Sequence, residues 1–231
     1  MLKRDSILQH DRRSRVRTLM SQRCAWLFLA LLALLVWLPY MGSSLPSRIL
    51  MGTLHAAILV SASTLMRINR LSIILVIMLA LPALGFQIAA LVRDDAGLTV
   101  VYWVFGALFY VASLAHLLRY VLGPESMNED KLFGAAAAYL MLGMTWSYCY
   151  GIVQYFYPWS FAVHGSPVFM LPLFDTVYFS FTVLTSTGFG DIAALTPQAR
   201  SLANLESICG ILFVAILVAR LVGVYPGVSK E

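Results

Sequence analysis

The chain has 231 residues, of which 60% are hydrophobic and only 12% are charged. A soluble globular domain carries about 25% charged residues, so this composition excludes one and predicts a protein that crosses a membrane several times. The net charge of +5 includes a basic N-terminus, which we expect to contact anionic lipid headgroups rather than nucleic acid.

Six apolar runs are long enough to cross a bilayer, since a spanning helix needs about 20 residues. They are Cys24 to Tyr40, Ile49 to Met66, Leu71 to Val92, Leu98 to Leu122, Leu132 to Tyr157 and Ser201 to Val224. No small-residue cleavage site follows the first run, so we expect a retained span rather than a signal peptide. The sequence therefore predicts an all-α membrane protein with six transmembrane helices.

The positions of Lys and Arg predict the orientation of these spans. If the N-terminus is cytoplasmic, only Arg48, Arg93 and Arg200 of the 16 basic residues fall on the outer side. We therefore predict a multi-pass protein of the cell (inner or plasma) membrane, with both termini in the cytoplasm.

The polar stretch 123–131, GPESMNEDK, is the clearest internal break, because Gly-Pro ends a helix and charged residues follow. We expect it to be a cytoplasmic linker between two halves of the chain. Before it lie the basic N-terminus, 1–23, and a four-helix domain, 24–122. The C-terminal half is 132–224.

The fourth predicted span carries no charged residue from Leu98 to Ala115, and only His116 and Arg119 lie near its end. A voltage-sensing helix carries arginines at every third position, because gating charge must cross the membrane field. We therefore predict that the four-helix domain lacks gating charges. We expect His116 and His55 to be hydrogen-bonded packing residues, although an intramembrane sensor is the alternative.

Cysteine and histidine offer no sign of a cross-link or a metal site. Cys24, Cys149 and Cys209 are odd in number and lie in or beside predicted spans, so no disulfide framework is implied. No metal-ligand spacing relates them to the four histidines. We expect no organic cofactor.

A seventh apolar run, Asp175 to Thr185, is too short to cross a membrane and predicts a re-entrant helix with Asp175 as its N-cap. The polar stretch that follows, Thr185 to Asp191, contains two glycines separated by one residue and then an acid. Such backbone is tolerated at membrane depth only where it lines a water-filled path or is buried in protein. An ordinary turn between helices is the alternative, but it gains nothing from this pattern.

The stretch 175–191, DTVYFSFTVLTSTGFGD, resembles the pore helix and selectivity filter of tetrameric potassium channels, and 196–223 resembles their inner helix. The filter of that family reads T-V-G-Y-G-D, and this chain has S-T-G-F-G-D at 186–191. The resemblance begins near Leu132. It implies a potassium-channel-like homotetramer with a pore helix at 175–185, a filter at 186–190 and an inner helix at 197–224.

By this resemblance, potassium ions bind the carbonyl oxygens of the filter. The ion-binding residues are Ser186, Thr187, Gly188 and Phe189, with Gly190 at the outer mouth. The supporting residues are Tyr178, Phe179, Thr185, Asp191 and Glu206. Tyr178 and Phe179 occupy the positions of an aromatic cuff, and Tyr178 is the candidate partner of Asp191. Phe189 lacks the phenol oxygen of the family's tyrosine, which weakens the prediction of potassium selectivity.

The inner helix should begin at Thr196-Pro197, as N-cap and first-turn proline. Gly210 lies where the family has a flexible glycine, although close packing explains it equally well. Ile211, Val214, Val218 and Val222 follow at helical spacing, either as a cavity-facing gate or as packing residues. Because a buried acid in a span needs a partner, we expect Glu206 to hydrogen-bond the pore helix or the filter backbone.

Three functions compete at this point. The first is a potassium-selective channel, and the second is a weakly selective monovalent cation channel of the same fold. The third is a six-helix membrane enzyme or transporter subunit. The spans contain no Ser-His pair, zinc motif or paired acids for hydrolysis, so we do not expect an enzyme. A transporter would show interrupted helices in both halves, whereas only one half has such an interruption.

Overall fold

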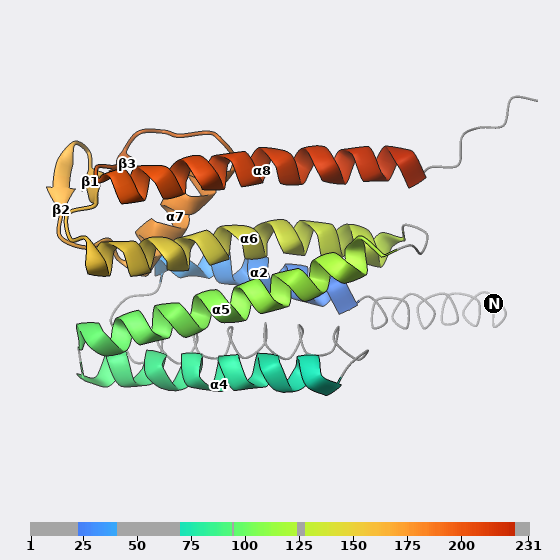
Figure 1. The fold of residues 1–231 in the computed structure, drawn as a ribbon, viewed down its shortest axis with the longest axis horizontal. Helices are drawn as coiled ribbons and strands as arrows, with labels where there is room; N and C mark the ends of the chain where they lie inside the picture. Colours follow the sequence, from blue (N-terminus) through green and yellow to red (C-terminus); the bar gives the residue numbers. More distant parts are fainter. Residues whose placement is uncertain (1–22, 41–69, 94, 124–127, 225–231) are drawn as a thin grey trace, which may run out of the picture.

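The computed structural model of the protein describes residues 23–40, 70–93, 95–123 and 128–224. Long helices run side by side along the longest axis of the molecule (Figure 1). They are α2 (Arg23–Trp37, followed by the short 3-10 helix η1, Leu38–Tyr40), α4 (Arg70–Arg93), α5 (Ala96–Val121), α6 (Glu129–Phe156) and α8 (Pro197–Val224). The short helix α7 (Leu173–Leu184) and three short strands lie toward one end.

In the described part, 4 helices are long and apolar enough to cross a membrane. They are Arg23–Tyr40, Ala96–Val121, Glu129–Phe156 and Pro197–Arg220. Helix α4 contains a shorter apolar stretch, Ile77–Ala90. The predicted second span, Ile49 to Met66, lies outside the described residues, as do His55 and most of the basic N-terminus. The protein is thus a mostly helical membrane protein, and the number of six spans stays a prediction.

Side-chain caps determine where α5 and α6 begin. The Oδ1 atom of Asp95 accepts a hydrogen bond from Gly97 N at 2.7 Å, and that of Asn128 accepts one from Lys131 N at 2.8 Å. Such a cap satisfies an amide that a helix start leaves free. Because Asn128 is the cap, α6 begins at Glu129. The last three residues of the predicted linker 123–131 are therefore helical.

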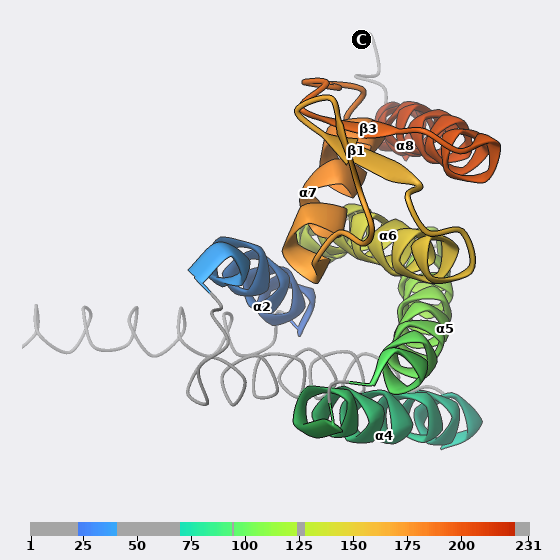
Figure 2. The ribbon, with the colours of Figure 1, turned by 90° about the vertical axis from the view of Figure 1, so that its left-hand side faces the viewer.

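Glycines let α5 and α6 pack closely. A Cβ atom at Gly106 of α5 would lie 2.6 Å from the Tyr148 ring, and one at Gly151 of α6 would lie 2.7 Å from the Trp103 ring. Each helix therefore inserts a buried aromatic ring into a glycine notch of the other. The hydroxyls of Tyr102 and Tyr148 are 2.8 Å apart and hydrogen-bonded. Helix α6 lies between α5 and α7 (Figure 2), so it joins the four-helix half to the rest.

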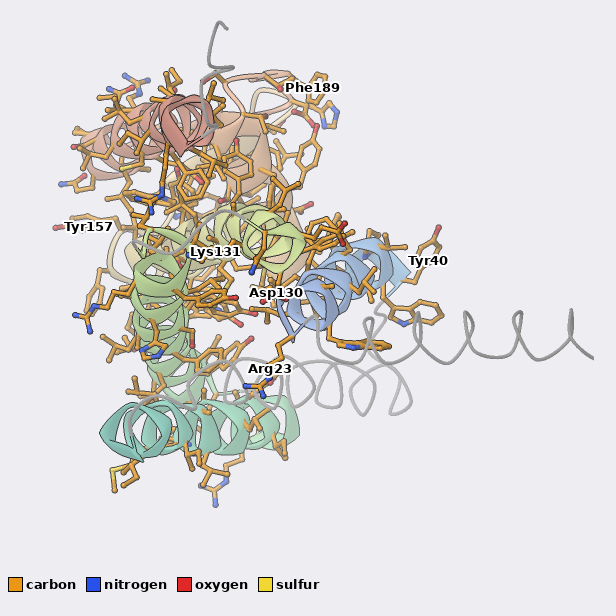
Figure 3. All side chains as sticks on the ribbon, turned by 90° about the vertical axis from the view of Figure 1, so that its right-hand side faces the viewer. Arg23, Tyr40, Asp130, Lys131, Tyr157 and Phe189 are labelled. Carbon is orange, nitrogen blue, oxygen red and sulfur yellow. The ribbon has the colours of Figure 1, made fainter. Side chains whose placement is uncertain are left out.

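The end of the molecule at which α5 stops and α6 begins, called here the linker end, has its own polar contacts. Asp130, at the start of α6, accepts hydrogen bonds from Cys24 N at 2.9 Å and from the Tyr120 hydroxyl at 2.8 Å. Figure 3 shows Asp130 between α6 and α2. The carbonyl oxygen of Gly123 accepts a hydrogen bond from Arg220 Nη2 of α8 at 2.5 Å. These contacts connect α2, α5, α6 and α8.

A three-stranded antiparallel sheet lies at the opposite end of this mostly helical fold. The sequence analysis, which predicts an all-α protein, does not include this sheet. Its order is β2 (Ser166–Val168), β1 (Phe161–Val163) and β3 (Ile192–Ala194). A two-residue turn joins β1 to β2, with φ of 48° at His164 and 79° at Gly165. Strand β3 directly follows the glycine-rich loop, so the sheet holds the outer end of that loop.

The segment between α6 and α7 is fastened to α6 by one buried side chain. Gln154 donates to Leu171 O at 2.9 Å and accepts from Leu171 N at 2.8 Å. A small core forms behind the sheet, where the rings of Tyr150, Phe161 and Phe179 contact one another at centroid distances of 5.0–5.7 Å. The sheet, α6 and α7 are thus packed together.

Candidate functional site

Helix α7 begins two residues earlier than predicted. It covers Leu173–Leu184, its N-cap is Pro172 and no side chain caps it. Asp175, predicted as the cap, lies in the first turn instead. The reason is that Pro172 has φ −64° and ψ 161°, an extended conformation that suits a residue before a helix. Asp175 still places its carboxyl group at the positive end of the helix, and partial burial, with Asp191 nearby, raises its pKa.

The backbone of the loop that follows α7 alternates in hand. Ser186, Gly188 and Gly190 have φ of 56°, 53° and 81°. Thr187 and Phe189, which lie between them, do not have positive φ. A residue with a Cβ atom adopts the left-handed region at a free-energy cost, and two of the three left-handed positions are glycine. Alternation of this kind turns successive carbonyl groups toward the same side of the chain.

The amide groups at the inner end of this loop point back toward α7. Ser186 N donates to Val183 O at 2.8 Å, and the amides of Thr187 and Gly188 both donate to Thr182 O, at 2.9 and 3.1 Å. Within the described residues, no backbone amide donates to a carbonyl oxygen of 186–190. The loop therefore satisfies these donors internally and leaves its carbonyl oxygens available for a ligand.

Hydroxyl groups surround the inner end of the loop. Thr185 Oγ1 donates to Phe181 O at 2.7 Å and lies 2.8 Å from Thr187 Oγ1. Ser186 Oγ lies 3.2 Å from Ser207 Oγ of α8. The side chain of Ser186 is therefore hydrogen-bonded to the neighbouring long helix.

Aromatic and acidic groups meet at the outer end of the loop. The rings of Tyr178 and Phe189 are stacked, with centroids 6.4 Å apart and an interplanar angle of 8°. A hydrogen bond from Tyr178 to the Asp191 carboxylate raises the pKa of the tyrosine. The backbone oxygen of Asp191 accepts from His164 N, in the β1–β2 turn, at 2.7 Å. Phe179, by contrast, points away from the loop into the core behind the sheet.

Glu206 is the buried acid behind the loop, with no exposed surface. Its Oε1 atom lies 2.5 Å from the Ser180 hydroxyl of α7, and its Oε2 atom accepts a hydrogen bond from the Tyr150 hydroxyl of α6. Ser180 Oγ is also 2.7 Å from the carbonyl oxygen of Gly143. The acid thus connects three helices.

The hydrogen bonds around Glu206 limit how protons can be shared in the cluster. The Ser180 hydroxyl has one proton but two oxygen partners, and one of them, the Gly143 carbonyl, can only accept. If the hydroxyl donates to Gly143, the bond to Glu206 needs a proton on the carboxyl group. A protonated carboxyl group would then let every hydroxyl and carboxyl oxygen of the cluster take part in a hydrogen bond.

Gly210 is a packing glycine in this structure. A Cβ atom there would overlap the carbonyl oxygen of Leu184, the last residue of α7, and would lie 3.0 Å from its carbonyl carbon. The same oxygen accepts a hydrogen bond from Tyr139 of α6 at 3.2 Å. The sequence analysis offers two roles for Gly210, a flexible position and a close-packing position. The contacts in the structure support close packing.

The predicted gate residues lie farther along α8. Ile211, Val214 and Val218 are 58%, 47% and 51% exposed in the single chain, and the side chain of Val222 lies outside the described residues. Helix α8 itself begins as expected, at Pro197, and Thr196 Oγ1 accepts from Ala199 N at 3.4 Å. The roles of these four residues stay predictions.

The structure also adds residues that the sequence analysis did not single out. They are Tyr139, Tyr150, Ser180 and Ser207. A buried acid predicts that hydroxyl partners exist, but four helices contain many hydroxyls, and only the packing selects among them. The residues 178, 185–191, 206 and 210 are those that the structure does bring together around the loop.

A long helix (α6), a short helix (α7), the glycine-rich loop and a second long helix (α8) follow one another along this part of the chain. Residues 137–225 match the family model described as an ion channel. This part of the chain is therefore similar to that family. No curated protein and no solved structure gives a significant match to the chain.

Proposed function

We propose that the protein is a channel that conducts potassium ions passively across the cell membrane. The observation that supports this most is the loop 186–190, in which left-handed backbone alternates with right-handed backbone. Because the amides of Ser186, Thr187 and Gly188 are bonded to α7, the carbonyl oxygens are free to replace the hydration shell of an ion. The resulting sites are at Ser186, Thr187, Gly188 and Phe189, with no other cofactor.

We further propose that four copies assemble around the loop. One chain carries one such loop and cannot surround an ion by itself. Helix α8 is strongly apolar, yet most of its surface is exposed in the single chain; Leu205, Ile208, Ile211 and Leu212 are each more than half exposed. Contact with other copies would cover this surface, and Val214, Val218 and Val222 would line the inner cavity and its gate. This homotetramer has both termini in the cytoplasm and the basic N-terminus on anionic lipid headgroups.

The proposal is tested by ion flux into vesicles that contain the purified protein. With potassium on one side and sodium on the other, the reversal potential should approach the potassium equilibrium potential. Empty vesicles and the Gly188→Ala variant serve as controls. A potential close to zero, with robust flux of both ions, would instead support a weakly selective cation channel, and no flux at all would contradict conduction.

Weak selectivity is the second candidate, and Phe189 is the observation in its favour. Phe189 offers no hydroxyl to its surroundings and stacks on Tyr178. If this loosens the loop, Phe189→Tyr should increase potassium over sodium permeability, whereas Phe179→Tyr, in the core behind the sheet, should not. Equal selectivity in wild type and Phe189→Tyr would remove the argument for the second candidate.

A further inference from the structure

The segment 155–174 comprises the connection between α6 and α7 and the adjoining residues of both helices. Its composition is unusual for a connection outside a membrane. It contains no Asp, Glu, Lys or Arg. Five of its aromatic side chains are largely exposed: Phe156 65%, Tyr157 45%, Trp159 54%, Phe169 56% and Phe174 45%. A concentration of exposed aromatic side chains without charged neighbours in the segment indicates contact with a partner or a membrane rather than with water.

The exposure of these rings is a feature of the fold. Trp159 N donates to Phe169 O at 3.4 Å, and the two rings contact each other edge to face, with centroids 5.7 Å apart. Trp159 adopts φ of 65°, which is unfavourable for a residue with a Cβ atom. Phe161, two residues farther along, is 1% exposed. The structure therefore buries one aromatic ring of the segment and holds a neighbouring pair outward.

The position of the segment matches the boundary of a bilayer. Helix α6 has 28 residues, which is a length of about 42 Å at 1.5 Å per residue, whereas the hydrocarbon core is about 30 Å thick. The end of α6 can therefore extend beyond the hydrocarbon into the headgroup region. Phe156 and Tyr157 lie at that end. Tryptophan and tyrosine are enriched at this depth in membrane proteins.

We propose that the segment 155–174 is an interfacial membrane anchor, whose exposed aromatic side chains lie among lipid headgroups at the end of the molecule that carries the sheet. Lipid is favoured over a second copy by the placement of Tyr157. Figure 3 shows Tyr157 on the opposite side of the molecule from Phe189, and copies that share a pore meet on the Phe189 side. The choice of lipid over a second copy rests on the proposed function. The composition of the segment and the exposure of its aromatic rings do not depend on it.

The anchor has a direct connection to the loop. Strand β1 of the segment pairs with β3, which begins directly after Asp191, and His164 N binds Asp191 O. The lipid headgroups thus hold the sheet, and the sheet holds the outer end of the loop. A change in bilayer thickness would reach this end of the loop through β1.

The test uses the fluorescence of Trp159 in the full chain reconstituted into phosphatidylcholine vesicles. The difference between the emission of wild type and of Trp159→Phe reports Trp159 alone. We expect this difference to lose most of its intensity with lipids brominated near the headgroup end of the acyl chain, and little with acrylamide in the water. Quenching by acrylamide alone would show a water-exposed ring and overturn the proposal. Quenching by neither would show a ring covered by protein, which overturns it too.

A matched pair of charge insertions sharpens the result. Phe169→Glu should shift the Trp159 emission to longer wavelength and reduce its quenching by brominated lipid, because the charge draws the aromatic pair into water. Ser166→Glu, on the exposed β2 strand, should leave both unchanged. Equal effects of the two variants would mean that any added charge disturbs the hairpin. Neither measurement depends on ion conduction, so a failure here is separable from a failure of the proposed function.

Discussion

The two ends of the region that matches the ion channel family model are held together in different ways. Toward the sheet, α8 is tied to α6 and α7 through Glu206 and Gly210, and to the loop through Ser207. Toward the linker, the described part of α8 from Ile211 onward makes one side-chain hydrogen bond, from Arg220 to Gly123. One chain therefore completes the structure around the loop but leaves the other end of α8 open. The first end is held by hydrogen bonds and close packing within the chain, whereas much of the second is exposed in the single chain.

The largest effect is expected at the loop itself. Gly188→Ala should abolish potassium flux, because a Cβ atom disfavours the left-handed φ of 53° by about 1–2 kcal/mol and turns the carbonyl groups away. Stability should fall by no more than this strain, since no atom lies within 4 Å of the new Cβ. Flux into vesicles and thermal unfolding in detergent measure the two effects. Normal flux in the variant would remove the loop as the ion path.

A slightly smaller effect is expected at the packing glycine. Gly210→Ala forces a methyl group onto the carbonyl of Leu184, and overpacking of this kind destabilises by about 1–3 kcal/mol. We expect a lower melting temperature together with reduced flux. Val214→Ile, which adds one carbon on the open half of α8, is the control and should leave the melting temperature nearly unchanged. Equal shifts in melting temperature for the two variants would contradict the proposed difference in packing between the two ends of α8.

Glu206 offers a comparison within one site. Glu206→Ala leaves the buried Tyr150 hydroxyl without its partner, whereas Ser180 keeps its bond to Gly143, and an unsatisfied buried group costs about 1–3 kcal/mol. Glu206→Gln should be far milder, because an amide both donates and accepts, as the protonated acid does. Thermal unfolding of the two variants decides the point. A large loss of stability for Gln would mean that the carboxyl group is ionised.

Tyr178→Phe should have a modest effect, on selectivity and open lifetime more than on stability. It removes the hydrogen bond to Asp191 but keeps the stack with Phe189. Asp191→Asn tests the same bond from its other side. Single-channel recordings under mixed potassium and sodium should show similar changes for both variants. No change in either would leave the aromatic stack as the support of Phe189.

The smallest effect concerns pH. Because burial and Asp191 raise the pKa of Asp175, the folded protein binds its proton more tightly than the unfolded chain does. Stability should then fall as the pH rises through and above the ordinary carboxyl range. Asp175→Asn should flatten this dependence in unfolding measured across that range. A steeper fall of stability with pH in the variant would contradict the raised pKa of Asp175.

Much of this organisation is readable from the sequence, since apolar length predicts α5, α6 and α8 to within a few residues. The unpredicted parts depend on one local side-chain cap and on contacts between distant segments. Asn128 begins α6 early because its side chain caps the helix, and the sheet exists only because residues near 161 meet residues near 192. The loop 186–191 is evident from its glycines and acid. The partners of Glu206 are not, because they come from two other helices.

The paired notches between α5 and α6 limit how the two helices can move. If either helix turned about its own axis, Trp103 would leave Gly151 and meet a residue with a side chain, and Tyr148 would do the same at Gly106. Sliding along the axis is blocked in the same manner. The two notches therefore oppose any movement of α5 against α6, and we expect the two helices to move together.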